Sequence, residues 1–367
     1  KADSANTVRA LAFRFSDKGM ADRSHPFAVL ELYLCAPEFR EFERMTTTVV
    51  NAFLGPTMQR YIERLAKRLG DAGLNIAPNL TQSNGGVIGF DAAQTFPVKT
   101  LLSGPSTGVI AAGKIAQSAG FDDIITFDVG GTSSDVALLK DGVCNRTGEA
   151  DVHGYPIKAP MLDIHTVGAG GGSIAYVDTG GLLKVGPKSA GADPGPVCYG
   201  RGGRAPTVTD ANIVLQTLNP EAILGGRMKV RRDLAVSAIQ TLADKLGLSL
   251  QETAQGILAV ATANMAKAIR VISVQRGYDP RDYALMAFGG GGPLHAARLA
   301  KELDMARVIV PTTPGALCAL GLLMTDLLAD FAQSVSTTLV PEALEEIENT
   351  YRWLEEKAGE WFVAEGV

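Results

Sequence analysis

Aromatic side chains are scarce in this sequence, and long apolar runs are absent. Only 6% of the 367 residues are Phe, Trp or Tyr, whereas 41 residues are glycine. This composition argues against a β-sandwich and favours an α/β protein with many tight turns between strands and helices. No stretch approaches about 18 uninterrupted apolar residues, so the sequence predicts no membrane-spanning helix.

Basic clusters and paired cysteines are also lacking. The formal net charge is −5, and Lys and Arg are scattered along the chain rather than gathered into a patch. Nucleic acid is therefore not an expected partner. The cysteines are far apart and include no CxxC pair, which predicts reduced, packed thiols in a cytoplasmic protein. They are Cys35, Cys144, Cys198 and Cys318.

Histidine is equally sparse, with four residues and no HxH, HExxH or Cys/His cluster. The sequence thus predicts no transition-metal site built by this chain. His165, in DIHTVGAGGGS, precedes a glycine loop. It is a candidate catalytic residue with Asp163 as companion, or it holds the loop by hydrogen bonds. Asp210, in VTDAN, is expected to cap the helix that follows it.

The periodicity of apolar residues predicts alternating strands and helices. A helix is expected over residues 46–73, kinked or split at Pro56, and a long core helix over 250–277. Residues 141–210, rich in Gly, Pro and Asp, are expected to form short strands and functional loops. Strands are also expected at 8–15, 74–86 and 306–311 and on both sides of the turn within 126–139. Helices are expected at 103–120, 315–331 and 341–363. Residues 283–303 are expected to form a strand, a glycine loop and a helix.

The stretch TFDVGGTSSDVALL, residues 126–139, places a glycine turn between two apolar strands. Glycine carries no Cβ, so Gly130 and Gly131 allow backbone amides to approach an anion closely. Thr132 and Ser133 add hydroxyl donors beside them. We therefore expect these four residues to bind the phosphates of a nucleotide.

Two carboxylates flank this turn, one on each strand. Asp128 ends the first strand and is expected to hold Mg²⁺ or its waters, which bridge to phosphate oxygens. Asp135 begins the second strand and is expected to fix the hairpin or the metal shell. We treat both as candidate catalytic residues. The alternative is a tight turn with capping carboxylates and no ligand.

A second glycine cluster, FGGGGPLH at 288–295, follows an apolar strand and opens a helix. In this position Gly289, Gly290, Gly291 and Gly292 would let a nucleoside lie against the backbone, and the helix N-terminus favours phosphate. The alternative is a close packing turn between strand and helix. If both clusters contact one nucleotide, they lie within about 15 Å of each other.

The order of these motifs resembles the hydantoinase A/5-oxoprolinase family. The resemblance spans roughly residues 37–330 and rests on an ordered series of segments. They are PEFREFERMTTTVVNAFLGP, TQSNGG, LLSGPSTGV, FDVGGTSSDVALL, HTVGAGGGSIAYVD, ADPGPVCYGRGG, PTVTDANIVL and AFGGGGPLHAARLA. The family implies an α/β fold of the actin-like ATPase (ribonuclease H-like) type, with ATP and Mg²⁺ as cofactors.

The resemblance also implies a division of the chain. Residues 1–36 are expected to be the end of an N-terminal domain or a linker. Residues 37–330 would form the ATPase core, with 141–210 as a glycine-rich insert, and 331–367 a C-terminal helical extension. Members of the family begin with a first phosphate hairpin of the DxGGTxTD type, whereas this sequence contains one hairpin that corresponds to the second. We therefore expect this chain by itself to bind ATP weakly or not at all.

The function implied by the resemblance is ATP-dependent phosphorylation of an amide or carbonyl oxygen. It leads to ring-opening hydrolysis of a hydantoin or lactam, or alternatively to carboxylation of a ketone. A B-type subunit is the implied partner, and the substrate is a small cyclic amide or ketone. A further alternative is an actin-like ATP-binding module without chemistry of its own.

Overall fold

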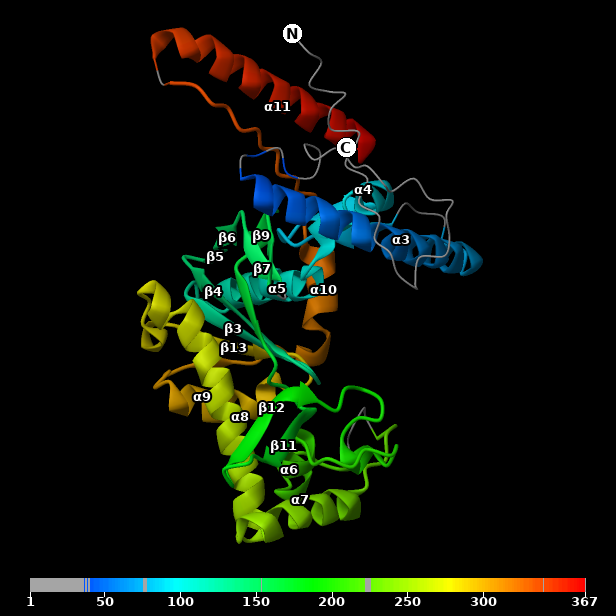
Figure 1. Ribbon diagram of the computed structural model, residues 1–367, viewed down its shortest axis with the longest axis vertical. Coiled ribbons are helices and arrows are strands. Elements are labelled where there is room, and N and C mark those ends of the chain that lie inside the picture. The colour runs from blue at the N-terminus through cyan, green and yellow to red at the C-terminus, as the bar shows by residue number, and fades with distance from the viewer. Residues whose placement is uncertain are drawn as a thin grey trace. The chain divides into compact units, whose positions relative to one another are not determined.

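The computed structural model describes residues 36, 38, 40–74, 78–152, 154–221, 226–338 and 340–366. These described residues divide into two compact units, whose elements are labelled in Figure 1. The sheet unit is drawn from the described residues within 107–145 and 163–324, and the terminal unit from those within 36–106, 146–162 and 325–366. The strand predicted at 8–15 and Cys35 lie outside the described residues. The predicted domain limits at residues 36 and 330 stay predictions.

The sheet unit is built around one mixed β-sheet with strand order β10–β4–β3–β13–β14, and β5 pairs with β4. Strand β4 is antiparallel to β3 and β10, whereas β13 and β14 run parallel to β3. Its strands are β3 (Ile124–Val129), β4 (Ser134–Lys140), β5 (Val143–Cys144), β10 (Ile164–Val167), β13 (Ala284–Phe288) and β14 (Val308–Ile309). This is the strand order of the ribonuclease H-like fold, and the predicted α/β class is confirmed.

Helices and a second, two-stranded sheet complete this unit. The helices are α5 (Ser103–Ser118, of which Thr107 onward belongs here), α6 (Val208–Val214), α7 (Arg232–Leu246), α8 (Leu250–Ile272), α9 (Gly292–Glu302) and α10 (Leu317–Met324). The small sheet pairs β11 (Ser173–Val177) with β12 (Leu183–Ser189), and short 3₁₀ turns are η3 (Val197–Tyr199), η4 (Val274–Arg276), η5 (Pro280–Asp282) and η6 (Pro314–Ala316).

Side chains alternate between the two faces of the main sheet. Phe127 and Val129 on β3 and Val136 on β4 share one face, which is buried under α8 and α9 in a single apolar cluster. Asp128 and Asp135 lie between these residues in the strands, so they belong to the opposite face. The sheet therefore separates an apolar core from a face that carries two carboxylates.

Helix α8 confirms the long core helix predicted from periodicity. It begins with a capping box, in which Ser249 and Glu252 satisfy each other's backbone amides. Ile257, Met265 and Ile269 on its predicted apolar face are fully buried. The segment Leu250–Arg276 is long and apolar enough to cross a membrane by composition. Its apolar residues instead form the core of this unit, which is why the segment is apolar.

The terminal unit contains a long helix, several short strands and a C-terminal helix. Its helices are α3 (Glu41–Asp71), α4 (Phe90–Thr95) and α11 (Leu344–Ala364), with 3₁₀ turns η2 (Pro97–Thr100) and η7 (Pro341–Ala343). Its strand pairs are β1 (Asn79–Thr81) with β2 (Val87–Gly89), β6 (Arg146–Thr147) with β9 (Met161–Leu162), and β7 (Ala150–Val152) with β8 (Tyr155–Ile157).

A kink or a split was predicted at Pro56. Helix α3 is continuous through this residue, so a split is wrong, and a kink stays a prediction. Proline removes one helical hydrogen bond, but packing on both sides holds the helix together. On the N-terminal side, the buried Asn51 amide donates to Thr95 O at 3.1 Å, and its Oδ1 accepts from Val98 N at 3.1 Å. On the C-terminal side, Ile62 is buried in an apolar cluster.

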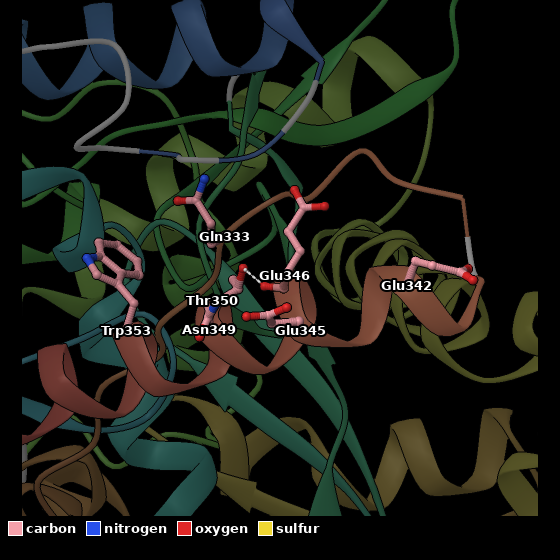
Figure 2. A pocket seen from close by; sticks show the side chains of 7 residues that line it. All are labelled: Gln333, Glu342, Glu345, Glu346, Asn349, Thr350 and Trp353. Atoms are coloured by element: carbon pink, nitrogen blue, oxygen red, sulfur yellow. Dashed lines mark hydrogen bonds between the residues drawn. The ribbon is translucent and has the colours of Figure 1, made fainter.

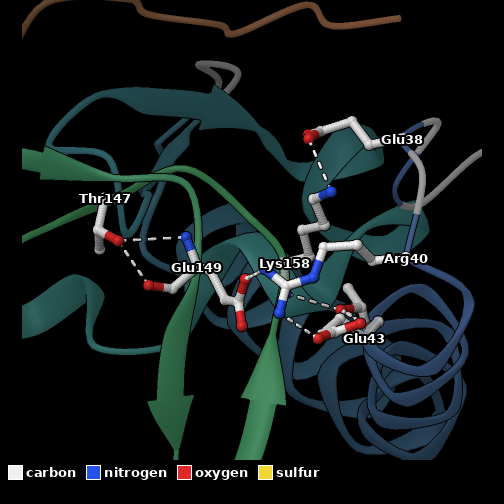
Figure 3. Close-up of polar contacts among 7 residues, drawn as sticks. Glu38, Arg40, Glu43, Thr147, Glu149 and Lys158 are labelled. Atoms are coloured by element: carbon white, nitrogen blue, oxygen red, sulfur yellow. Dashed lines mark hydrogen bonds and ion pairs between the residues drawn. The ribbon is translucent and has the colours of Figure 1, made fainter. Parts of the chain in front are cut away.

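Ion pairs surround the start of α3, as Figure 3 shows. Arg40 contacts Glu43 one turn further along and Glu149, whose Oε2 lies 2.6 Å from Nη1. Lys158 Nζ lies 2.9 Å from Glu38 Oε2. Half or more of the Arg40 side chain is exposed, and exposed pairs contribute roughly 0–1 kcal/mol each. We assign them no functional role.

The predicted C-terminal helix is present as α11, but its apolar residues are not buried. Leu344 and Tyr351 are 52% and 65% exposed, and no residue of α11 is buried. Contact with the rest of the unit is made near the C-terminal end, where Trp361 packs against an apolar cluster and Glu365 accepts from Gly89 N. The spacing of apolar residues therefore predicted the helix correctly, but it did not show whether these residues are buried.

Candidate nucleotide and magnesium site

The glycine turn of residues 130–133 forms the tip of the hairpin between β3 and β4. Gly130 N donates to Ser133 O at 3.0 Å and closes the turn. Gly130, Gly131 and Thr132 are exposed, and a Cβ added to Gly131 would meet no atom within 4 Å. The amides of Gly131 and Thr132 donate to no group in the described part of the chain. The tip therefore offers free backbone donors in open space, as an anion site requires.

A supporting glycine loop, residues 168–172, packs directly against this tip. Gly171 N donates to Gly130 O at 3.1 Å, and Gly172 N donates to Gly131 O at 2.6 Å. A Cβ on Gly170 would lie 2.9 Å from Gly130 O, and one on Gly172 would lie 2.8 Å from Gly131 O. The glycines here are required by close backbone packing, and the loop fixes the carbonyls of the tip.

The same loop is tied to the first turn of α6. Thr209 donates to Gly171 O from both its amide and its hydroxyl, each at 2.8 Å. Ser134 Oγ, at the start of β4, donates to Ala169 O. These contacts show that the segment GAGGGS supports the hairpin tip, a role that the sequence interpretation missed. The sequence signal for this role was a run of glycines next to buried strands, with no charged residue inside the run.

Asp128 and Asp135 lie directly opposite each other on β3 and β4. Each has one side-chain donor: Cys318 Sγ lies 3.3 Å from Asp128 Oδ2, and Thr166 Oγ1 lies 2.5 Å from Asp135 Oδ1. Burial raises the pKa of both carboxyl groups above the usual aspartate range, and the nearby Asp135 raises that of Asp128 further. A cation at this place would favour their charged forms.

The second glycine cluster meets the hairpin, which confirms the proximity expected from the sequence. Phe288 on β13 pairs with Asp128 on β3, so the loop after β13 begins beside that carboxylate. Gly289 has φ of +76°, and a Cβ there would lie 2.1 Å from Asp128 Oδ1. Gly291 N donates to Val129 O at 2.8 Å. Contact of this loop with a nucleoside stays a prediction.

The four glycines of this loop differ in their surroundings. Gly290 is exposed, and a Cβ on it would meet nothing within 4 Å. Gly292 is buried at the first position of α9, where a Cβ would lie 3.1 Å from Phe127 O. Both uses expected from the sequence, open backbone and close packing, therefore occur within one loop.

The structure does not bring His165 to the two carboxylates. On β10, Thr166 pairs with Asp135, whereas His165 pairs with Val136 and shares its core-facing side of the sheet. Burial lowers the pKa of His165, which favours the neutral ring. Its expected companion Asp163 instead forms an ion pair with Arg276. A catalytic role for His165 remains a prediction without support from its position.

Asp210 takes part in capping, but the helix does not begin after it as expected, because α6 begins at Val208 with Thr207 as its N-cap residue. Asp210 is the third residue of α6 and forms a capping box with Thr207. Its carboxylate also accepts from Val197 N at 3.2 Å and Cys198 N at 2.7 Å. It is fully buried and saturated with donors, so it orders the loop before α6.

The segment GPSTG, residues 104–108, matches the G-x-S-x-G pattern of serine hydrolases. Ser106 is fully buried inside α5, however. Its hydroxyl donates to Gln82 O at 2.8 Å and to Ser103 O at 2.7 Å. A nucleophilic serine requires an exposed hydroxyl next to a base, so this match is structural.

A hollow in the terminal unit, with a volume of about 680 Å³, lies along α11. Figure 2 shows the side chains that line it. Three glutamates and no basic residue line it, and the full lining is Gln333, Glu342, Glu345, Glu346, Asn349, Thr350 and Trp353. Like charges repel, so this surface is unsuited to a nucleotide. Within the described ranges, no group of three or more His, Cys, Asp or Glu residues is placed to hold a metal ion. A cation at Asp128 would therefore take its remaining ligands from phosphate and water.

Comparison with known proteins agrees with this fold and motif order. The chain matches the hydantoinase/oxoprolinase family over residues 44–331. It is 41% identical to the caprolactamase subunit alpha of Pseudomonas jessenii over 338 residues, which is 90% of this chain and 49% of that protein. It is 39% identical to the acetophenone carboxylase gamma subunit of Aromatoleum aromaticum, over 80% of this chain and 40% of that subunit.

A solved structure has the same fold. The nucleotide-free structure of acetone carboxylase, described with a mechanism of ATP-dependent acetone carboxylation, superposes with a TM-score of 0.78 at 28% identity. The match covers 90% of this chain and 48% of the other. The chain belongs to the hydantoinase/oxoprolinase family, and it spans about half the length of the first curated relatives that it matches.

Proposed function

We propose that this chain is the ATP-binding part of an enzyme that phosphorylates an amide or carbonyl oxygen. The observation that carries the proposal is the meeting of two glycine loops beside Asp128 and Asp135, with the hairpin tip open. Open amides at the tip would bind phosphate, and the second loop would contact the nucleoside. The activities of similar proteins, a caprolactamase and two ketone carboxylases, support this chemistry.

The residues at this place suit Mg²⁺. Carboxylate and hydroxyl oxygens are the donors that Mg²⁺ prefers, and Asp128, Asp135 and Thr166 provide only these. We infer that Asp128 would hold the cation directly and that Asp135 would order its waters. When bound, Mg²⁺ would neutralise charge on the phosphates of ATP.

The chain's own contribution would be placement of the phosphoryl group. The amides of Gly131 and Thr132 donate to phosphate oxygens, and the hydroxyls of Thr132 and Ser133 add further donors. The loop at 170–172 keeps the tip carbonyls occupied, so the amides stay directed outward. Such prearranged donors stabilise charge without reorganisation during the reaction.

We propose a lactam or hydantoin as the substrate class. The carbonyl carbon of a cyclic amide is a poor electrophile, and transfer of the γ-phosphoryl group to its oxygen, with ADP leaving, converts that oxygen into a leaving group. Water adds to this carbon, and the ring C–N bond then breaks as the nitrogen takes a proton from the added hydroxyl group. A second water hydrolyses the resulting acyl phosphate and releases phosphate. The 41% identity to a caprolactamase subunit favours this reading. The structural likeness to acetone carboxylase favours the second candidate, phosphorylation of a ketone enolate before carboxylation.

A partner subunit belongs to this proposal. The two curated relatives are a subunit alpha and a subunit gamma, so both function within larger assemblies. We propose a B-type subunit as the partner that carries the later steps. A cytoplasmic location is also proposed, because Cys198 and Cys318 are free thiols.

ATP turnover by the intact assembly tests the proposal. Phosphate release would be measured with a lactam, a hydantoin, 5-oxoproline, and a ketone with bicarbonate. We expect a cyclic amide to stimulate turnover most, whereas stimulation by the ketone with bicarbonate would select the second candidate. Asp128→Asn should lower turnover by about 100-fold or more. Asp122→Asn, in the exposed turn before β3, is the matched control. Equal activity of both variants would contradict the assigned role of Asp128.

A further inference from the structure

The thiol of Cys318 lies next to the carboxylate that the proposed site depends on. Cys318 is the second residue of α10, and its Sγ lies 3.3 Å from Asp128 Oδ2. A thiol carries one S–H donor, and at this distance its acceptor is the Asp128 carboxylate.

The backbone around this thiol is closely packed. A Cβ on Gly108 of α5 would lie 2.8 Å from Cys318 Sγ and 2.8 Å from Phe288 Cε2. One turn further along α10, a Cβ on Gly321 would lie 2.0 Å from Thr107 O. Helix α10 thus packs on α5 at backbone distance, which sets the position of Cys318 relative to β3.

The two oxygens of Asp128 consequently have different neighbours. Oδ2 accepts from Cys318, whereas Oδ1 lies over Gly289, where a Cβ would come within 2.1 Å of it. A half-buried carboxylate with one oxygen held by a donor loses rotational freedom about its last bond. Its other oxygen then stays beside the second glycine loop.

We propose that Cys318 is a positioning residue, which holds Asp128 in the orientation needed for the cation of the nucleotide. The part concerning the cation rests on the proposed function, whereas the contact itself does not. A packing role is the competing explanation, because a thiol is also a small apolar group that fills space. Substitution of Cys318 by serine and by alanine distinguishes the positioning role from the packing role, because both substitutions remove the sulfur and only serine keeps a hydrogen-bond donor.

The first readout is the Mg²⁺ concentration that gives half-maximal ATP turnover in the intact assembly. We expect Cys318→Ala to raise this concentration by about five-fold, as loss of one weak hydrogen bond to a charged group predicts. Cys318→Ser should remain within about two-fold of the unchanged protein. Cys198→Ala removes a fully buried thiol in another apolar cluster and is the matched control. It should not change the Mg²⁺ dependence.

The second readout needs no activity. The infrared S–H stretching band of Cys318 is isolated as the difference between the unchanged protein and Cys318→Ala. A donating thiol absorbs at lower frequency, so we expect this band to move toward higher frequency in Asp128→Asn, whose neutral amide is a weaker acceptor. A band that does not respond to Asp128→Asn would overturn the contact even if the assembly proves inactive with ATP.

The two readouts separate the possible failures. Equal Mg²⁺ dependence of the Ala and Ser variants would overturn the positioning role and leave packing as the explanation. A responsive S–H band in a protein that hydrolyses no ATP would support the contact while rejecting the proposed function.

Discussion

Two groups of glycines lie a few ångströms apart in the sheet unit and have opposite surroundings. At the hairpin tip, Gly131 faces open space, and a side chain there would meet nothing within 4 Å. In the supporting loop, Gly170 and Gly172 would place a Cβ 2.9 Å and 2.8 Å from backbone atoms of the tip. The difference shows that glycine serves access in one place and close packing in the other, although the sequence pattern is similar.

The loop after β13 combines both kinds of glycine and gives the largest expected effect. Gly289→Ala places a Cβ 2.1 Å from Asp128 Oδ1 and 2.6 Å from Val129 O, at a residue with φ of +76°. Overpacking and backbone strain together should destabilise the protein by about 2–5 kcal/mol. Gly290→Ala, one residue further, should change stability by roughly 0.5 kcal/mol or less. Urea unfolding of both variants measures this difference in stability. Equal stability of the two variants would contradict the assignment of Gly289 as crowded and Gly290 as open.

His295, in the first turn of α9 behind this loop, should make stability depend on pH. It is 2% exposed, and burial lowers its pKa from 6.5 to about 4. The unfolded chain therefore binds a proton more readily than the folded chain between these values. Stability contributed by the neutral ring is complete above pH 6.5 and falls by about 3 kcal/mol as pH drops toward 4.

His295→Gln should remove this part of the pH dependence. The two proteins are compared by urea unfolding at several pH values between 7 and 4. The difference between them isolates the histidine, because the other titrating groups are shared. Parallel stability curves would show that the ring is not buried as a neutral group.

The open and crowded glycines are compared most directly by Gly131→Ala and Gly172→Ala. A Cβ on Gly172 collides with Gly131 O and Ser189 Oγ, and it should cost about 1–3 kcal/mol of stability. A Cβ on Gly131 should leave stability nearly unchanged but occupy the space of the anion, which we expect to weaken MgATP binding about ten-fold. Calorimetry and unfolding of the intact assembly measure both quantities. The reverse pattern would exchange the roles assigned to the two loops.

Much of the sheet unit was predictable because its signals are local. Alternating apolar strands around a glycine turn predicted the hairpin, and helical spacing predicted α8. The contact between the hairpin and the loop after β13 was also expected, because one ligand would have to touch both. Here periodicity, turn chemistry and burial all point the same way.

Other features depend on tertiary contacts that no local pattern reveals. Pro56 predicted a kinked or split helix, yet anchoring by Asn51 and Ile62 keeps α3 continuous. The helical spacing of α11 predicted a helix but could not show that Tyr351 stays exposed. The sequence predicts only a packed thiol at Cys318. Its contact with Asp128 could not be predicted, because that distance arises from the packing of α10 on α5.

The central claim is that the hairpin tip, the second glycine loop and Asp128 form one site for MgATP. A structure of the intact assembly with Mg²⁺ and a non-hydrolysable ATP analogue tests it most directly. We predict phosphates against the amides of residues 131–133, the cation at Asp128 and the nucleoside against residues 289–291. A nucleotide bound elsewhere on the chain, with the hairpin tip facing only solvent, would contradict the account.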